Sequence, residues 1–250
     1  MKINVLRLLL LLLVLPLTTS ARTSYVIADI STHEVALDYR FKGQYVTISL
    51  IYDGESDIIL AITGPDLGYK IWKKEKRYGI WLNGQSYSVP KAKSYFSFAA
   101  TKNIYEITDI KTLRKYNLDF NYDDYKATEE YPSLTSEAFK QEFIKYRQKL
   151  KLYPLKPELI EKASGNNLLR TKLFLPEHAV SGIYKLEVYA FRNGKMVSQT
   201  SSSFTAKKYG LYARVEFLSM HKTLQYSLIS IIIALAAGAA AGFVFRKDKS

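Results

Sequence analysis

The sequence predicts a mainly β protein, a β-sandwich of immunoglobulin-like architecture with a helical insertion and one C-terminal transmembrane helix. Three observations lead to this prediction. Short apolar runs with period two, punctuated by turn dipeptides, occupy residues 25–100 and 168–206. A helical pattern separates them at 137–149. An uncharged apolar run of membrane-spanning length covers 224–245.

The N-terminus has the order of a secretory signal peptide. Lys2 and Arg7 precede an apolar run over 8–17, and small residues follow it up to Ala21. The apolar run is too short to span a bilayer, which needs roughly 20 residues. We therefore expect residues 1–21 to be a signal peptide cleaved after Ala21. An uncleaved N-terminal anchor is the alternative.

The first part of the mature chain has the pattern of β-strands. Apolar residues alternate with others over 46–52, and the continuous run Ile58–Ile62 is typical of a central strand that ends at Gly64-Pro65. Further strands are expected at 69–74, 78–82 and 94–100. Asn83-Gly84 indicates a hairpin, because a type I′ turn needs positive φ at both central residues.

The middle of the chain, about 103–153, is expected to be a helical insertion. Residues 119–132 form an acidic, tyrosine-rich connection without a clear period. The helix at 137–149 follows, and one face of it carries the apolar stripe Phe139, Phe143, Tyr146 and Leu150, with Lys140, Lys145 and Gln148 outside the stripe. We expect this stripe to pack against the sheet. A groove-filling contact with a partner is the alternative.

β structure returns after the insertion. A strand is expected over 168–175, and a hairpin joins the strand containing 184–190 to the strand 196–206. Asn193-Gly194 is the turn of this hairpin, which is the strongest local prediction in the sequence. Together the segments define one expected domain over 22–209.

Residues 210–223 are expected to form a juxtamembrane helix that runs into the span as one long helix. The span at 224–245 would extend roughly 33 Å, against a hydrocarbon core of about 30 Å. Arg246, Lys247 and Lys249 follow it at once, and basic residues beside a span favour the cytoplasmic side. We therefore expect a single-pass type I topology, with residues 246–250 as a short cytoplasmic tail.

Small residues form a face on the expected span. Ala234, Gly238 and Gly242 recur every four residues, a spacing that lets two helices approach closely. This face is a candidate contact with another membrane helix, either of a transporter or of a second copy. Spans contain this spacing by chance as well, so a purely lipid-facing helix is the alternative.

The charge of the chain is strongly positive and unevenly spread. The formal net charge is +13. Cations and aromatic rings gather in one segment, here called the basic ribbon: Lys70, Trp72, Lys73, Lys74, Lys76, Arg77 and Trp81. This composition suits a membrane interface or an anionic partner. The alternatives are that the cations are simply solvated and that the two tryptophans belong to the core.

Few residues in the sequence indicate catalysis. The chain has no cysteine, which excludes disulfides, thiolate catalysis and a cysteine-linked lipid anchor. His33, His178 and His221 lack a second ligand at metal spacing, and the chain has neither a nucleophile elbow nor a glycine-rich phosphate loop. We expect a protein that is not an enzyme and has no cofactor, metal or nucleic-acid partner.

Several stretches together resemble one family. They are Phe41-Lys42-Gly43, Asp57 to Pro65, Gly79 to Asn83, Tyr95 to Ala100, Leu173 to Pro176, Gly182 to Tyr184, Val188 to Gly194 and the alanine- and glycine-rich span. This pattern resembles the putative transmembrane protein family of alphaproteobacteria, whose members have a signal peptide and one C-terminal span. Residues 103–132 match it least.

The resemblance implies a place and a role. It implies the inner membrane of a Gram-negative envelope, with the bulk of the chain in the periplasm, and a gene neighbourhood beside a sulfite-exporter-type permease. We expect a membrane-anchored binding or accessory module that assists a transporter. The first alternative is an envelope-surface binder that holds anionic lipid or polymer through the basic ribbon. The second is a hydrolase with an unrecognised carboxylate site.

Overall fold

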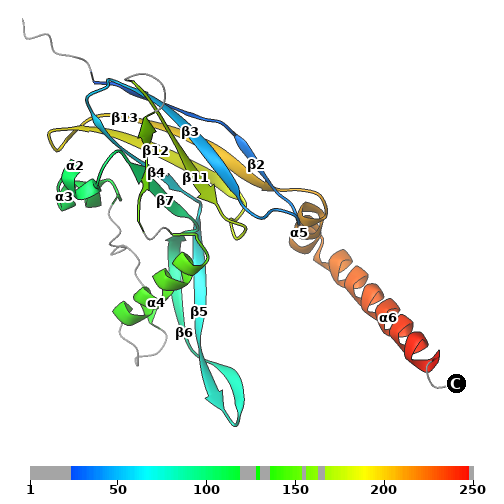
Figure 1. Ribbon diagram of the computed structural model, residues 1–250. Helices are drawn as coiled ribbons and strands as arrows, with labels where there is room; N and C mark the ends of the chain where they lie inside the picture. Colours follow the sequence, from blue (N-terminus) through cyan, green and yellow to red (C-terminus); the bar gives the residue numbers. More distant parts are fainter. Residues whose placement is uncertain (1–23, 119–127, 130–135, 154–155, 163–166, 248–250) are drawn as a thin grey trace, which may run out of the picture.

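The computed structural model describes most of the chain after the expected signal peptide. The described residues are 24–118, 128–129, 136–153, 156–162 and 167–247 (Figure 1). The signal-peptide prediction and Lys249 therefore lie outside the described residues. So does the acidic connection, apart from two of its residues.

Two sheets pack face to face as a sandwich (Figure 1). The four-stranded sheet has the order β1 (Val26–Ile30), β3 (Gln44–Tyr52), β11 (Leu168–Leu175), β10 (Glu161–Lys162). The six-stranded sheet has the order β2 (Glu34–Leu37), β13 (Lys195–Lys208), β12 (Gly182–Arg192), β4 (Asp57–Thr63), β7 (Phe96–Ala100), β9 (Glu158–Leu159). Neighbours are antiparallel except β2 with β13 and β7 with β9. The predicted mainly β sandwich is confirmed, whereas its immunoglobulin-like character is not.

The burial of the strands follows their apolar patterns. In β3 the residues Val46, Ile48 and Leu50 point into the core, while Tyr45 and Ile51 are exposed on the outer face. In β4, which lies between β12 and β7 in the sheet, the whole run Ile58–Ile62 is buried, so this strand is covered on both faces. Burial on both faces explains why this strand needs a continuous apolar run.

The predicted β12–β13 hairpin is present. Asn193 and Gly194 have φ of 52° and 77°, and Arg192 pairs with Lys195 across the turn. The Thr108 hydroxyl donates a 2.7 Å hydrogen bond to the Gly194 carbonyl, so the turn is held from outside the sheet.

A long hairpin of β5 (Asp66–Arg77) and β6 (Ile80–Lys93) projects from the sandwich (Figure 1). Its turn differs from the prediction, since Tyr78 and Gly79 carry the positive φ of 53° and 81°. Asn83-Gly84 lies inside β6 instead. A Cβ on Gly84 would collide with the Glu75 side chain, so this glycine allows a close approach rather than a turn.

The insertion contains α2 (Ile104–Ile107), α3 (Ile110–Lys115), β8 (Thr128–Glu129), which pairs with β6, and α4 (Ser136–Lys149). Helix α4 covers the hairpin. Phe139 stacks on Tyr87 with ring centroids 4.1 Å apart, and Phe143 lies 5.5 Å from Tyr69. The expected packing of this helix against a sheet is thus observed, and the sheet is the projecting hairpin.

The face that α4 buries differs in part from the predicted stripe. Phe139 and Phe143 are buried as expected, but Tyr146 is 58% exposed. Lys140 and Arg147 are buried in its place. Arg147 is accommodated there because its long side chain lies over the rings of Tyr69 and Tyr153.

The C-terminal segment consists of two helices rather than one. Helix α5 (Leu211–His221) ends at Lys222, whose φ of −137° and ψ of 53° are not helical, and α6 (Thr223–Lys247) begins immediately afterwards. The prediction of one continuous helix was therefore wrong. Residues 223–243 of α6 have a mean hydropathy of 2.0 and no contact that buries them, so α6 is the candidate membrane span.

Candidate functional site

The tip of the β5–β6 hairpin presents apolar side chains to solvent. We define the hairpin tip as residues 78–82. Tyr78 is fully exposed, Trp81 is 67% exposed, and Ile80 and Leu82 are exposed as well. Large apolar side chains gathered at one exposed point favour contact with a partner or a membrane. The exposure of Trp72 and Trp81 excludes the alternative that these tryptophans are core residues.

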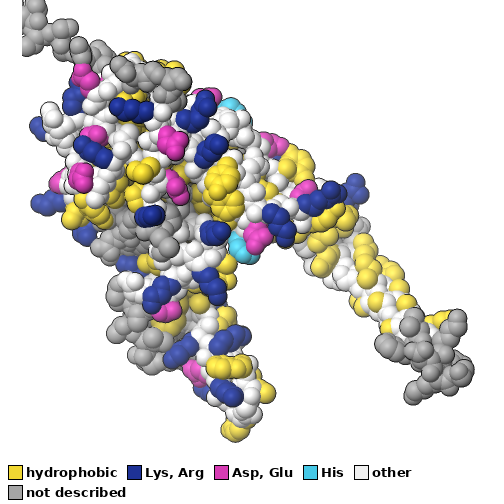
Figure 2. All heavy atoms as spheres, viewed as in Figure 1, with side chains coloured by type: hydrophobic (Ala, Val, Ile, Leu, Met, Phe, Trp, Pro, Cys, Tyr) yellow, Lys and Arg dark blue, Asp and Glu magenta, His cyan; other side chains and the backbone are white. Residues whose placement is uncertain are grey.

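The basic ribbon follows the same hairpin. Lys70 lies over the Trp72 ring, with its Nζ 4.9 Å from the centroid. Lys74 donates a hydrogen bond of 2.5 Å to Asn83, and Arg77 pairs with Glu75 at 2.9 Å. Lys73 and Lys76 are exposed. The fold therefore brings every predicted ribbon residue onto one projecting hairpin, where Figure 2 shows cations beside an apolar tip.

A groove of about 1320 Å³ lies between the hairpin and α4. Its apolar lining includes Ile71, Tyr87, Phe139 and Phe143, and its cations include Lys73. The groove extends from Lys74 and Asn83 near the tip to Leu152 and His178 near the sandwich. It is larger than the roughly 300–1,000 Å³ typical of ligand pockets, as expected of an open groove.

Arg147 lies in the wall of this groove and was not recognised in the sequence. Its guanidinium carbon is 4.8 Å from the centroid of Tyr69 and 5.2 Å from that of Tyr153, and its Nη2 donates to the Ser94 carbonyl. Burial raises the pKa of the Tyr69 hydroxyl, and the nearby Arg147 charge partly opposes that rise. Arg147 follows Phe143 by four residues, a spacing that places it on the apolar face of α4. A charged residue on that face was the signal in the sequence.

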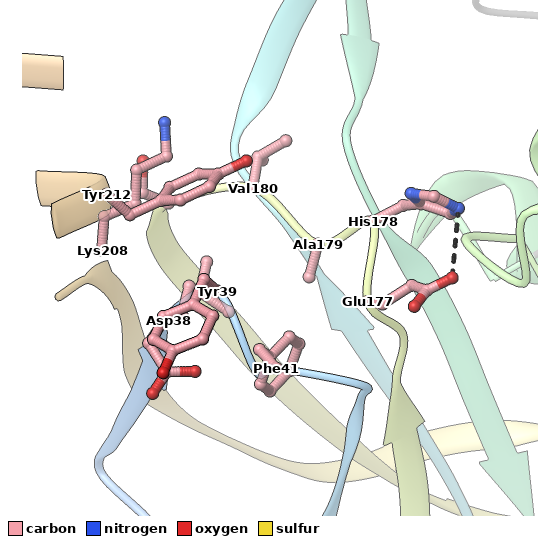
Figure 3. A pocket seen from close by; sticks show the side chains of 11 residues that line it. Asp38, Tyr39, Phe41, Glu177, His178, Ala179, Val180, Lys208 and Tyr212 are labelled. Atoms are coloured by element: carbon pink, nitrogen blue, oxygen red, sulfur yellow. Dashed lines mark ion pairs between the residues drawn. The ribbon is translucent and has the colours of Figure 1, made fainter. Parts of the chain in front are cut away.

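A second hollow, of about 530 Å³, lies where the sandwich meets α5 (Figure 3). Asp38, Tyr39 and Phe41 reach it from the β2–β3 connection, and Lys208 and Tyr212 from β13 and α5 (Figure 3).

Its charged side chains have partners, two of which lie outside the hollow. Glu177 lies 3.7 Å from His178 Nε2, Lys208 pairs with Glu216 at 2.6 Å, and Asp38 accepts the backbone N–H of Arg40.

The three histidines lie on separate elements. His33 precedes β2, His178 follows β11 and His221 ends α5. Within the described residues, no three histidine or acidic side chains gather as a metal site would require.

The small-residue face lies on α6. Ala234, Gly238 and Gly242 are all exposed, and a Cβ at either glycine would meet nothing within 4 Å. Arg246 and Lys247 form the last residues of α6. The structure thus leaves this face accessible to another helix.

Comparison with known proteins supports the membrane assignment. No curated protein matches the chain. A family model described as "putative transmembrane protein" matches residues 25–247, which include the sandwich, the hairpin and the span. The chain therefore belongs to this putative transmembrane protein family of alphaproteobacteria, as the sequence resemblance implied.

Proposed function

We propose that the protein is a membrane-anchored periplasmic binding module whose hairpin tip contacts anionic lipid headgroups of the membrane that holds α6. The observation that carries this proposal is the combination of exposed Trp81 and Ile80 with the cations of the basic ribbon on one projecting hairpin. Aromatic rings beside lysine and arginine are the composition that proteins use at membrane interfaces.

The arrangement of the molecule supports this contact. The hairpin and α6 project from the sandwich toward the same side of the molecule (Figure 1). Once α6 is in a bilayer, the hairpin tip is held close to that bilayer at high effective concentration. The contact then needs little affinity of its own.

Helix α5 supplies a second interfacial element. It has no buried residue, and its exposed apolar side chains include Leu211, Phe217 and Met220. An exposed apolar helix next to a span is suited to the headgroup region. The break at Lys222 lets α5 and α6 take different directions, one along the surface and one through it.

The energetic contributions favour an anionic surface. Each lysine or arginine near such a surface contributes about 1 kcal/mol. The ribbon carries five cations, and among them Arg77 pairs with Glu75, Lys74 donates to Asn83 and Lys70 lies over the Trp72 ring. Several kcal/mol of lipid-dependent attraction are therefore available, and salt should weaken it.

The test uses the two tryptophans, which are the only ones in the chain and both lie on the hairpin. The full-length Trp72→Phe protein reports on Trp81 alone. In proteoliposomes, adding phosphatidylglycerol to phosphatidylcholine should shift Trp81 emission to the blue. The triple variant Lys73→Glu/Lys74→Glu/Arg77→Glu should lose this shift.

The matched control reverses Lys185 and Lys195, two exposed cations on the β12–β13 hairpin. This control should keep the blue shift. An equal shift in the triple variant would contradict the proposal.

A second candidate is an accessory role beside a membrane transporter, through the small-residue face of α6. The exposure of Gly238 and Gly242, with open space around both, favours close approach of another helix. Gly238→Leu/Gly242→Leu should abolish cross-linking of α6 to a transporter or to a second copy in native membranes. Unchanged cross-linking would exclude this face as the contact.

A further inference from the structure

Arg147 is a buried cation without an anionic partner in the described part of the chain. Only 6% of its surface is exposed, and its Nη2 donates a hydrogen bond to the Ser94 carbonyl. Within the described residues, its Nε has no hydrogen-bond partner. The aromatic rings around it stabilise the charge, but they provide no acceptor for the Nε–H.

The Tyr69 hydroxyl is also buried, which raises its pKa, and it lies close enough to this guanidinium for Arg147 to oppose that rise by charge and by hydrogen bonding. Its own O–H finds no acceptor among the described residues. A buried donor that is left unsatisfied costs about 1–3 kcal/mol. Two such donors at one place, beside a buried positive charge, match an acceptor that carries two oxygens and one negative charge. A carboxylate has this chemistry.

The groove beside Arg147 is suited to an alkyl chain. Its wall includes Ile71, Tyr87, Phe139 and Phe143, and Glu142, its one carboxylate among the described lining residues, is paired with Lys145 at 2.9 Å. From Tyr69 to Lys74 the groove follows five strand steps, about 17 Å. One lipid chain spans half of a hydrocarbon core of about 30 Å, so the two lengths agree.

We propose that this groove binds a long-chain fatty acid, with the alkyl chain between α4 and β5 and the carboxylate at Arg147 and Tyr69. The inference goes beyond the contact of the hairpin tip with the bilayer and does not require it. A neutral lipid would leave the Arg147 charge without a counterion, and a small inorganic anion would leave the apolar wall exposed to water.

Trp72 lines the groove and therefore serves as the reporter. The full-length Trp81→Phe protein, in phosphatidylcholine nanodiscs, is titrated with 9,10-dibromostearate, whose bromines quench tryptophan on contact. We expect saturable quenching of Trp72. The methyl ester of the same acid, which has the same chain without the charge, should bind at least about tenfold more weakly, the loss expected for one charge-assisted hydrogen bond.

Two variants locate the site. Arg147→Gln should weaken dibromostearate binding about tenfold or more while the far-ultraviolet circular dichroism stays unchanged. Ile71→Asp places a negative charge in the groove, which repels the carboxylate of the ligand, and should abolish saturable quenching. Because Ile71 lies on the solvent-accessible hairpin, this variant tests the site even if Arg147→Gln fails to fold. The control Lys185→Glu should bind as the parent protein does.

Quenching that rises in proportion to added lipid without saturation, or equally with the methyl ester, would overturn the proposal. So would full affinity in Ile71→Asp. These outcomes leave the membrane contact of the tip intact, because that contact is measured at Trp81 in the Trp72→Phe protein. The two tryptophans thus separate the two proposals.

Discussion

Strands β4 and β5 follow one another in the chain, separated only by Gly64-Pro65, yet they have opposite environments. All five residues of Ile58–Ile62 are at most 3% exposed. In β5 most side chains beyond Ile71 are exposed, Trp72 among them. The comparison shows that the sandwich buries its apolar side chains in a core, whereas the hairpin leaves apolar and cationic side chains exposed, where they can contact a partner.

The largest expected effect is on the stability of the sandwich. Leu60→Ala in β4 removes a fully buried side chain and should lower the free energy of unfolding by about 2–5 kcal/mol. Leu82→Ala at the hairpin tip makes the same chemical change at an exposed site and should cost less than about 0.5 kcal/mol. Urea unfolding followed by circular dichroism measures both, and similar losses would contradict the division into two regions.

The second-largest loss of stability is expected at Arg147, which connects α4 with the hairpin. Arg147→Met removes the hydrogen bond to the Ser94 carbonyl and the contacts with the Tyr69 and Tyr153 rings. We expect a loss of about 2 kcal/mol, confined to the packing of α4 on the hairpin. Hydrogen exchange should accelerate in α4 and remain unchanged in β12. Faster exchange throughout the sandwich would show that Arg147 stabilises the whole domain.

Acid should weaken the sandwich through Asp53. Its burial alone would raise the carboxyl pKa, but hydrogen bonds from Ser56 and Glu55 and the Arg192 charge at 2.7 Å hold that pKa below its usual value. Because the folded pKa is lowered, ionised Asp53 contributes stability above its unfolded pKa near 3.8. That contribution is lost as the pH falls through the folded pKa.

Asp53→Asn should therefore cost about 1–3 kcal/mol at neutral pH and progressively less below pH 3.8. The hairpin offers the comparison, since Glu75 and Arg77 form a pair at 2.9 Å whose arginine is exposed and whose glutamate is half-buried. Glu75→Gln should cost less than about 1 kcal/mol. Unfolding of both variants across the acid range measures the difference, and a pH-independent cost for Asp53→Asn would contradict the assignment.

The smallest expected effect on stability belongs to the tip. Ile80→Ser/Leu82→Ser replaces two exposed apolar side chains and should leave the unfolding midpoint unchanged. It should nevertheless move Trp81 out of the lipid phase, because burying each side chain contributes about 1.5–3 kcal/mol. Trp81 emission that matches the parent in proteoliposomes would show that these side chains do not enter the bilayer.

The sequence predicted the sandwich better than the hairpin for a physical reason. Period-two patterns and the Asn193-Gly194 turn are local signals, and they located β3, β4, β12 and β13. The β5–β6 turn carries no such signal, because Tyr78 holds a positive φ that its residue type rarely adopts. Asn83-Gly84, the expected turn, instead accommodates the Glu75 side chain.

The candidate site was predicted only where composition alone revealed it. The basic ribbon lies within one short stretch of the sequence, so composition alone identifies its residues. The groove is not contiguous in the sequence, because residues of β5, β6 and α4 line it together. Arg147 lies four residues after Phe143, which places it on the buried face of α4, but only the tertiary structure reveals its contacts with the distant Tyr69 and Ser94. The break at Lys222 likewise lacks a helix-breaking residue.

The most direct test of the central claim is the depth of Trp81 in a bilayer. The full-length Trp72→Phe protein is reconstituted into phosphatidylcholine–phosphatidylglycerol vesicles whose lipid chains carry bromine close to the headgroups or near the chain ends. We predict strong quenching of Trp81 by the shallow bromines and weaker quenching by the deep ones, as for a side chain at the interface. Equal accessibility to aqueous acrylamide with and without lipid, and no quenching by either bromolipid, would contradict the account.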